Sequence, residues 1–349
     1  HITGEKYLYD QGYNDVFFQY GYQNHLKEVS HIIALIKDDP DQTNTYAMAR
    51  VLRVYAFEQI TDFYGDIPYS EANKGYLEAL FKPKYDKQSD IYADMLKELD
   101  EAAQMLDPAK PNIGPADFIY NGDAAKWKRF AYSMMLRLGM RLTKVDPAMS
   151  ENYVKKAIAG GVMQSNSDIA LLNHTNGTSL NWNWDSYYQN MEELRPNAMG
   201  YGLSKLCVTF VDFLKNNDDP RLPFYATLWE GNVDPSQLPA SSAPAVQKGL
   251  PNGYDNTTIH TAVPGWTDAS YLEYSEINLN TIANMAAPSI FQSYAEVELL
   301  LSEAAIRGWG DGNAQLHYNN ALTASMEMVT LFPGGFTISP TAISDYLAA

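Results

Sequence analysis

Hydrophobic residues recur every three to four positions through the first 150 residues, a spacing that places them on one face of an α-helix. After Ser89 they occupy positions 92, 95, 96, 99, 102, 103 and 106, and Asp107-Pro108 then interrupts the pattern. A similar stretch follows Asp123 and continues to near Asp146-Pro147. Ser and Asp are strong N-cap residues. We therefore predict two helices that begin at these caps.

Other segments predict further helices. Residues 46–64 are apolar on more than one face, which is typical of a helix packed between others. Shorter candidates lie at 26–36 and 151–159. Residues 289–307 and 314–329 predict a C-terminal helix pair, joined by the glycine-rich segment 308–312. Such a pair is the unit of tetratricopeptide-type stacking, although no strict repeat is visible.

The pattern changes between residues 160 and 288, where Gly, Pro, Asn, Ser and Thr accumulate. Helical periodicity persists there only near residues 203–214. Loops this long in a compact domain are usually functional, so we expect the ligand to bind in this region. The predicted organisation is a single domain, 1–349. Its parts are a helical scaffold (1–159), a loop-rich region (160–288) and a C-terminal helix pair (289–330).

The charge and composition exclude several classes of protein. Acidic residues number 42 and basic residues 25, for a net charge of −17. This balance disfavours binding to nucleic acid or to an anionic membrane surface. A single cysteine, Cys207, excludes an internal disulfide framework and a multi-thiolate zinc site. No apolar run reaches the length of a membrane-spanning helix. The chain opens at His1 without Met, which indicates a processed or trimmed chain.

Catalytic signatures are mostly absent: there is no H-E-x-x-H, G-x-S-x-G or P-loop sequence. No cofactor or metal site is predicted. Glu296 and Glu303 lie seven residues apart on one helix face, and a glycosidase needs only two carboxylates at a suitable separation. The favoured alternative is structural, in which these glutamates cap the helix, pair with Arg307 or meet solvent.

The strongest candidate binding motif follows from an excess of aromatic residues, with 25 Tyr, 13 Phe and 6 Trp. In an extended backbone, residues 181–188 (NWNWDSYY) place their two tryptophans on one face and polar side chains on the other. Flat rings stack on sugar rings, while amides and carboxylates bind hydroxyl groups. We predict a sugar platform of Trp182, Trp184 and Tyr187, with Asn183 and Asp185 as hydroxyl partners. The rival interpretation is that the tryptophans pin a long loop to the helices.

Four segments, in order, resemble the SusD/RagB family of outer-membrane nutrient-binding lipoproteins. Residues 49–72 resemble the family's helix and its fGDiPysEA ending, and residues 122–141 resemble its GD-x-x-kW-x-kfA…lRlamR pattern. Residues 219–222 match its DPRL, and residues 294–309 are similar to its yaEv-x-x-llAEAa-x-rGw. Together these segments frame residues 24–330.

The resemblance implies a mainly α fold, in which four tetratricopeptide-like helix pairs form a scaffold with a loop-rich irregular region packed against it. It also implies non-catalytic capture of an oligosaccharide or other nutrient at the extracellular face of the outer membrane. Delivery to a SusC-like TonB-dependent transporter would follow. The family's lipidated N-terminal cysteine and its RRTG-x-P-like C-terminal stretch are not found in this chain, so a lipid anchor is implied by the family alone.

A second set of site residues follows from the resemblance, because family members place ligand contacts on loops near the GDiP turn. This set comprises Tyr69, Asn73 and Tyr76. Trp266, in the Pro264-Gly265-Trp266 segment, is a third and separate candidate. Two other functions stay open at this point. A peptide- or protein-binding tetratricopeptide-like scaffold is the main alternative, and a glycoside hydrolase is the weaker one.

Overall fold

The computed structural model describes residue 9 and residues 11–174, 205–229, 240–255, 257–278, 280–284 and 286–349. The chain divides into two compact units. The first, which we call the helical unit, comprises residues 11–171 and 290–321. The second, which we call the loop-rich unit, comprises residues 1–10, 172–289 and 322–349.

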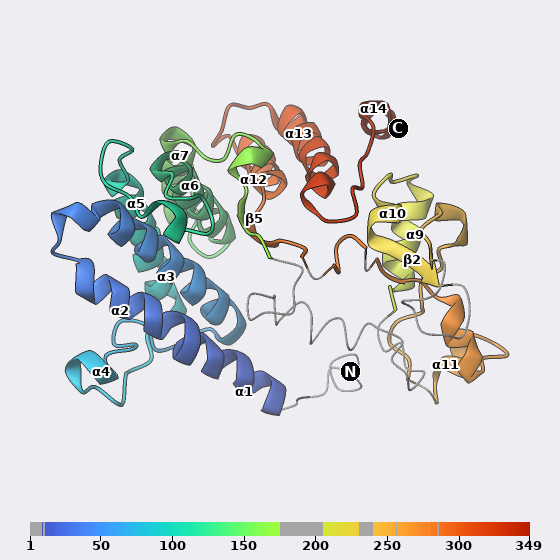
Figure 1. Ribbon diagram of the computed structural model, residues 1–349, viewed down its shortest axis with the longest axis horizontal. Helices are drawn as coiled ribbons and strands as arrows, with labels where there is room; N and C mark the ends of the chain where they lie inside the picture. The colour runs from blue at the N-terminus through green and yellow to red at the C-terminus, as the bar shows by residue number, and fades with distance from the viewer. Residues whose placement is uncertain are drawn as a thin grey trace. The chain divides into compact units, whose positions relative to one another are not determined.

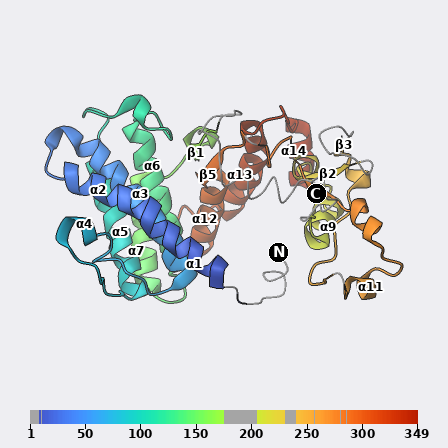
Figure 2. The same ribbon diagram turned by 60° about the horizontal axis from the view of Figure 1, so that its bottom comes forward.

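The helical unit is built mainly from long helices, drawn from blue to green in Figure 1 except for residues 290–321, which are orange to red; Figure 2 shows the same helices from another side. Its helices are α1 (Gln11–Tyr20), the π-helical turn η2 (Gly21–Leu26), α2 (Lys27–Ile36), the 3-10 turn η3 (Pro40–Gln42), α3 (Thr43–Tyr64), α4 (Gly75–Glu78), α5 (Gln88–Met105), η4 (Gly114–Ala116), α6 (Ala124–Arg141), α7 (Pro147–Gly160), η5 (Asn166–Asp168) and α12 (Tyr294–Ile306). Helix α13 (Ala314–Glu327) begins in this unit, and strands β1 (Ala170–Leu172) and β5 (Ser289–Gln292) pair at its edge.

Each long helix of this unit packs on the next, in the order α2, α3, α5, α6 and α7, and α12 packs on α6. The apolar positions predicted after Ser89 are all buried, and Leu99 among them has no exposed surface. Phe130 of α6 is likewise fully buried. Burial of one face along each helix supplies most of the stability of such a stack. The predicted fold class, a mainly helical scaffold combined with a loop-rich region, is confirmed.

The helix caps are partly as predicted. Asp123 caps α6 by accepting hydrogen bonds from the N–H groups of Ala125 (2.9 Å) and Lys126 (3.1 Å). Helix α6 ends at Arg141, before the predicted end, and Asp146 instead caps α7. Helix α5 already begins at Gln88, so the prediction that Ser89 is its N-cap is wrong.

The prediction of one helix over residues 289–307 is wrong in its first turn. Residues 289–292 form β5, which pairs with β1. Ser293 then caps α12 by accepting a hydrogen bond from the N–H of Glu296 at 3.1 Å. The strand depends on a partner more than 100 residues away in sequence, so local periodicity cannot reveal it.

The loop-rich unit contains shorter elements. They are α9 (Val208–Asn216), α10 (Leu222–Tyr225), β2 (Ala226–Trp229), β3 (Ala240–Ser241), η8 (Pro244–Val246), α11 (Ile259–Ala262), η9 (Asp268–Glu273), β4 (Glu276–Ile277), η10 (Met328–Leu331) and α14 (Pro340–Ala348). The strands form an antiparallel sheet in the order β3-β2-β4, with Leu228 opposite Ser241 and Thr227 opposite Glu276.

The DPRL segment ties two parts of the loop-rich unit together. Arg221 donates from Nε to Asp219 at 2.9 Å and from Nη1 to the hydroxyl of Ser325 at 2.8 Å. Phe224 packs edge-on against Phe332, with ring centroids 5.1 Å apart. The motif therefore has a structural role, because it fastens the C-terminal segment to α10.

Candidate functional site

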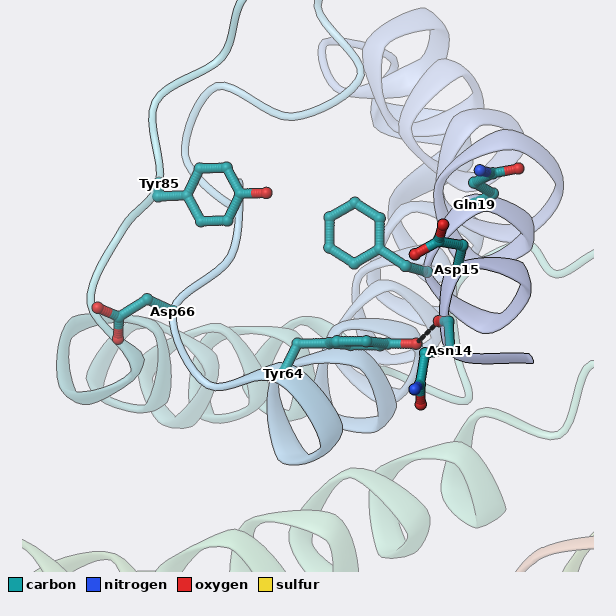
Figure 3. Close-up of a pocket in the computed structure, with 7 residues that line it drawn as sticks. Asn14, Asp15, Gln19, Tyr64, Asp66 and Tyr85 are labelled. Carbon is teal, nitrogen blue, oxygen red and sulfur yellow. Dashed lines mark hydrogen bonds between the residues drawn. The ribbon is translucent and has the colours of Figure 1, made fainter. Parts of the chain in front are cut away.

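A cavity of about 320 Å³ opens in the helical unit, beside the loop that follows α3. Figure 3 shows the residues around it. The described residues that line it contribute three aromatic rings, two carboxylates and two amides; they are Asn14, Asp15, Phe18, Gln19, Tyr64, Asp66 and Tyr85. The described residues hold no group of three or more His, Cys, Asp or Glu side chains that could bind a metal ion.

Helix α1 supplies one wall. Its four lining residues, at positions 14, 15, 18 and 19, are spaced three and four apart and so share one helix face. The next turn, η2, begins at Gly21, where an added Cβ would lie 2.6 Å from the side chain of Ile60 on α3. Glycine therefore permits the close approach of these two helices, which brings the lining residues of α1 next to the end of α3.

The end of α3 supplies the second wall. Gly65 adopts a φ of +73°, which side-chain-bearing residues rarely adopt. Its N–H donates to the carbonyl of Thr61 at 2.8 Å, and the Thr61 hydroxyl donates to the carbonyl of Gly65 at 2.7 Å. The helix therefore stops abruptly, which leaves Tyr64 in the last turn and Asp66 in the loop.

Tyr64 is fixed by its neighbours. Its hydroxyl donates a hydrogen bond to the backbone carbonyl of Asn14, as the dashed line in Figure 3 marks. The edge of its ring meets Phe18, with centroids 5.2 Å apart. Burial raises the pKa of Tyr64, and the nearby Asp15 carboxylate raises it further. The phenol therefore stays protonated at neutral pH and acts as a hydrogen-bond donor.

The loop after α3 supplies the third wall. Asp66 accepts a hydrogen bond from the backbone N–H of Gln88 at 2.9 Å, at the first residue of α5. Ile67 forms an isolated bridge with Asp86, whose N–H donates to the Ile67 carbonyl at 2.9 Å. This bridge holds Tyr85 across the cavity from α1. The hydroxyl of Tyr85 points into the cavity in Figure 3. The Tyr85 side chain remains 63% exposed, so a ligand can reach its ring.

Asp86 is itself held in place by the preceding turn. Its carboxylate accepts hydrogen bonds from the N–H groups of Ser70 (2.7 Å) and Tyr69 (3.2 Å) and from the Ser70 hydroxyl. Burial works against ionisation of Asp86, but the hydrogen bonds from Ser70 outweigh it and lower the pKa of this carboxyl. Through these hydrogen bonds the ionised carboxylate fastens the segment that carries Tyr85 to the turn at residues 69–70.

The second set of predicted site residues lies close to this cavity in sequence, and the two whose side chains the structure describes, Tyr69 and Asn73, do not line it. Tyr69 is only 5% exposed and donates its hydroxyl to Asp94 at 2.8 Å. Asn73 is half-buried, with a φ of +57°, and Tyr76 lies in the short helix α4.

The remaining predicted site residues fall elsewhere in the chain. Trp266, the third candidate, is 9% exposed and packs against Tyr271 and Tyr274 in the loop-rich unit. The predicted platform lies outside the residues that the structure describes; it comprises Trp182, Asn183, Trp184, Asp185 and Tyr187.

The residues that line the cavity are not among those predicted from the sequence. Tyr64 immediately precedes the GDiP motif, and Asp66 is the second residue of that motif. No helix was predicted over residues 11–20. The spacing of Asp15, Phe18 and Gln19 is helical and was the available signal.

The two glutamates considered for glycoside hydrolysis form ion pairs. Glu296 accepts two hydrogen bonds from Arg137, at 2.6 and 2.8 Å. Glu303 pairs with Arg307 at 2.6 Å, as the structural interpretation predicted.

Comparison with known proteins identifies the family of this chain. The SusD-like family described as "Starch-binding associating with outer membrane" matches residues 2–349. A chitin-binding protein of known structure is 32% identical, with a TM-score of 0.82, over 99% of this chain and 69% of that one. A SusD-like protein from Bacteroidetes is 26% identical, with a TM-score of 0.82, over 99% of this chain and 72% of that one.

A SusD homologue from Bacteroides fragilis is 25% identical, with a TM-score of 0.71, over 94% of this chain and 68% of that one. None of the curated proteins compared with this chain is similar to it. Among the helices that the structure describes, none has the length and hydrophobicity needed to cross a membrane. The family match spans nearly the whole sequence, and the chain therefore belongs to the SusD-like family, which associates with the outer membrane.

Proposed function

We propose that this protein binds a neutral glycan without cleaving it. The observation that carries the proposal is the cavity of the helical unit, where three aromatic rings stand beside amide and carboxylate groups. Aromatic faces stack on the C–H faces of sugar rings, and the polar groups can bind sugar hydroxyls. Membership of the SusD-like family supports this assignment.

The charge of the cavity favours an uncharged ligand. Among the described residues that line it, two are the acidic residues Asp15 and Asp66, and none is Lys, Arg or His. A glycan bearing carboxylate or sulfate groups would meet like charge there, which disfavours its binding. Chitin and starch, the polysaccharides in the descriptions of a 32% identical relative and of the family, are both neutral.

Calorimetry on a panel of oligosaccharides tests the proposal. We expect heat of binding with chito-oligosaccharides or malto-oligosaccharides, and none with oligogalacturonates or with a panel of unrelated peptides. Binding only to peptides would instead favour the alternative of a tetratricopeptide-like scaffold. Binding only to the acidic glycans would contradict the charge argument.

A non-catalytic role is part of the proposal, because the ion pairs of Glu296 and Glu303 engage both of the carboxylates considered for hydrolysis. Incubation with the glycan that binds, followed by measurement of reducing ends, should give no multiple-turnover release of sugar. Sustained release would identify a hydrolase.

We propose from the sequence a second stacking platform for the glycan. Its rings are Trp182, Trp184 and Tyr187, and its hydroxyl partners are Asn183 and Asp185. Trp182→Ala and Trp184→Ala should each weaken glycan binding while the melting temperature stays nearly unchanged. A loss of stability with normal binding by the folded fraction would favour the loop-anchor interpretation.

We also propose an N-terminal lipid anchor at the extracellular face of the outer membrane and transfer of the glycan to a SusC-like TonB-dependent transporter. Such an interface should be largely polar, because a lid that opens needs a transient contact. The full-length lipidated protein should copurify with a barrel protein from detergent-solubilised outer membranes. Its persistent absence from such preparations would count against the partnership.

A further inference from the structure

Two exposed phenylalanines lie beside the cavity without lining it. Phe63, in the last turn of α3, is 73% exposed, and Phe17, on α1, is 41% exposed. Their ring centroids are 5.0 Å apart, and the rings are tilted by 59°. We call these two rings the outer aromatic pair.

Tyr64 connects this pair to the cavity. The ring of Phe17 stacks nearly parallel to that of Tyr64, with 6.3 Å between centroids and 24° between planes. The ring centroids of Phe63 and Tyr64 are 6.5 Å apart. Tyr64 is also a wall of the cavity (Figure 3). The outer aromatic pair and the cavity are therefore parts of one continuous aromatic surface.

The helical geometry of α1 leads to the same result. Successive residues of an α-helix are about 100° apart around its axis, so Phe17 projects beside Asn14 at the margin of the cavity-lining face. Asn14 lines the cavity, and its backbone carbonyl accepts the Tyr64 hydrogen bond. One side of α1 thus serves the cavity, and the adjoining side carries the outer aromatic pair.

Single exposed apolar residues are ordinary in soluble proteins and need no explanation, but contiguous ones mark binding surfaces. Here two exposed rings touch each other and border a cavity whose walls suit sugars. Both rings are carried by helices, so a ligand that stacks on them finds them already positioned and loses little conformational entropy. A phenyl ring offers stacking without hydrogen bonds, which suits the C–H face of a sugar.

We propose that the outer aromatic pair is a second stacking subsite for the glycan that occupies the cavity. The ligand is then an oligosaccharide that reaches past Tyr64, with one part in the cavity and a neighbouring part on Phe63 and Phe17. This inference rests on the proposed function, because it assigns a length requirement to the same binding site.

The test measures affinity as a function of ligand length. Calorimetry with chito-oligosaccharides of one to six units, and with malto-oligosaccharides of the same lengths, should give wild-type affinities that rise with length. Phe63→Ala should bind the short members like the wild type and lose about tenfold or more in affinity for the longest ones. Phe63→Leu, which keeps apolar bulk but lacks a flat ring, should show the same loss.

Two variants provide matched comparisons. Phe118→Ala removes a ring of the helical unit that is similarly exposed, at 77% against 73% for Phe63, and should leave every affinity unchanged. Tyr85→Ala alters the cavity itself and should weaken short and long ligands alike. Since the Phe63 ring is mostly exposed, melting curves of both Phe63 variants should match that of the wild type.

The outcomes separate the two proposals. If Phe63→Ala and Phe63→Leu bind every length as the wild type does, the second subsite is overturned while glycan binding stands. The subsite is likewise overturned if those variants lose only the copurification with a barrel protein, since the pair would then contact that partner. If the wild type binds neither series at any length, the proposed neutral-glycan function fails, and the subsite fails with it.

Discussion

Arg137 on α6 directs Nη1 toward the carboxylate of Glu58 on α3, at 3.3 Å, and Glu58 has no exposed surface. Arg141 contacts the same carboxylate at 2.9 Å, while Arg137 also holds Glu296. Burial raises the pKa of Glu58, and the two guanidinium groups oppose that rise. The network joins three helices of the scaffold around the fully buried carboxylate of Glu58.

Removal of one partner from this network should therefore be costly. We expect Arg137→Met to lower the free energy of unfolding by roughly 3–5 kcal/mol, because it leaves a buried carboxylate without one of its two cations. The exposed pair of Arg307 and Glu303 provides the control, and Arg307→Met should cost less than about 1 kcal/mol. Urea denaturation of the two variants makes the comparison, and equal losses would contradict a structural role for the buried network.

The second prediction concerns Tyr85 in the cavity. Tyr85→Ala should weaken glycan binding by at least about tenfold, because a stacking face is lost. Tyr85→Phe keeps that face and should bind within a few-fold of the wild type. The side chain is mostly exposed, so neither change should shift the melting temperature appreciably. Isothermal titration calorimetry measures the affinities, and equal affinity of the Ala variant and the wild type would remove Tyr85 from the site.

The third prediction is a pH dependence that comes from Asp86. Its pKa in the folded protein lies below the usual value of 3.8, so the ionised form favours folding. That stabilisation is present above the unfolded pKa and is lost as the pH falls through the lowered one. Asp86→Asn should therefore melt at a lower temperature than the wild type at neutral pH, and the difference should shrink in acid. A constant difference across the pH range would show that Asp86 acts through its shape alone.

The fourth prediction concerns the turn that ends α3. Gly65→Ala should destabilise the protein by about 1–3 kcal/mol, because the positive φ of this position is strained for a residue with a Cβ. An added Cβ would meet no atom within 4 Å, so the cost is conformational and not steric. Gly310→Ala is the control, since Gly310 has no positive φ and an added Cβ there meets its nearest atom at 3.5 Å. Chemical denaturation should separate the two variants, and equal stability would contradict the argument.

Local patterns predicted the scaffold well and the cavity poorly, for a physical reason. The cap at Asp123 acts within three residues, so the sequence carries its signal directly. Tyr69 looks like an available aromatic residue in a loop, and only its contact with Asp94, 25 residues away, reveals that it is buried.

The cavity itself combines residues 14–19 with Tyr64 and Tyr85, three segments whose proximity depends on tertiary packing. The strand at 289–292 was missed for the same reason, since its partner is distant in sequence. The second set of predicted site residues and one wall of the cavity share the loop after α3, but the sequence could not distinguish the exposed rings of that loop from its buried ones.

Ring contacts extend from the cavity deep into the core. The ring of Tyr64 contacts that of Phe18, whose centroid lies 4.8 Å from the centroid of Tyr22. The Tyr22 centroid lies 6.3 Å from that of Phe57. The Phe57 centroid in turn lies 4.6 Å from that of Tyr69. A well-packed interior transmits a change in volume to its neighbours. Substitutions at Phe57, which is 1% exposed and does not line the cavity, can thus reposition a cavity wall. Evolution can retune the ligand preference of this protein from inside its core, at positions that a survey of ligand contacts would overlook.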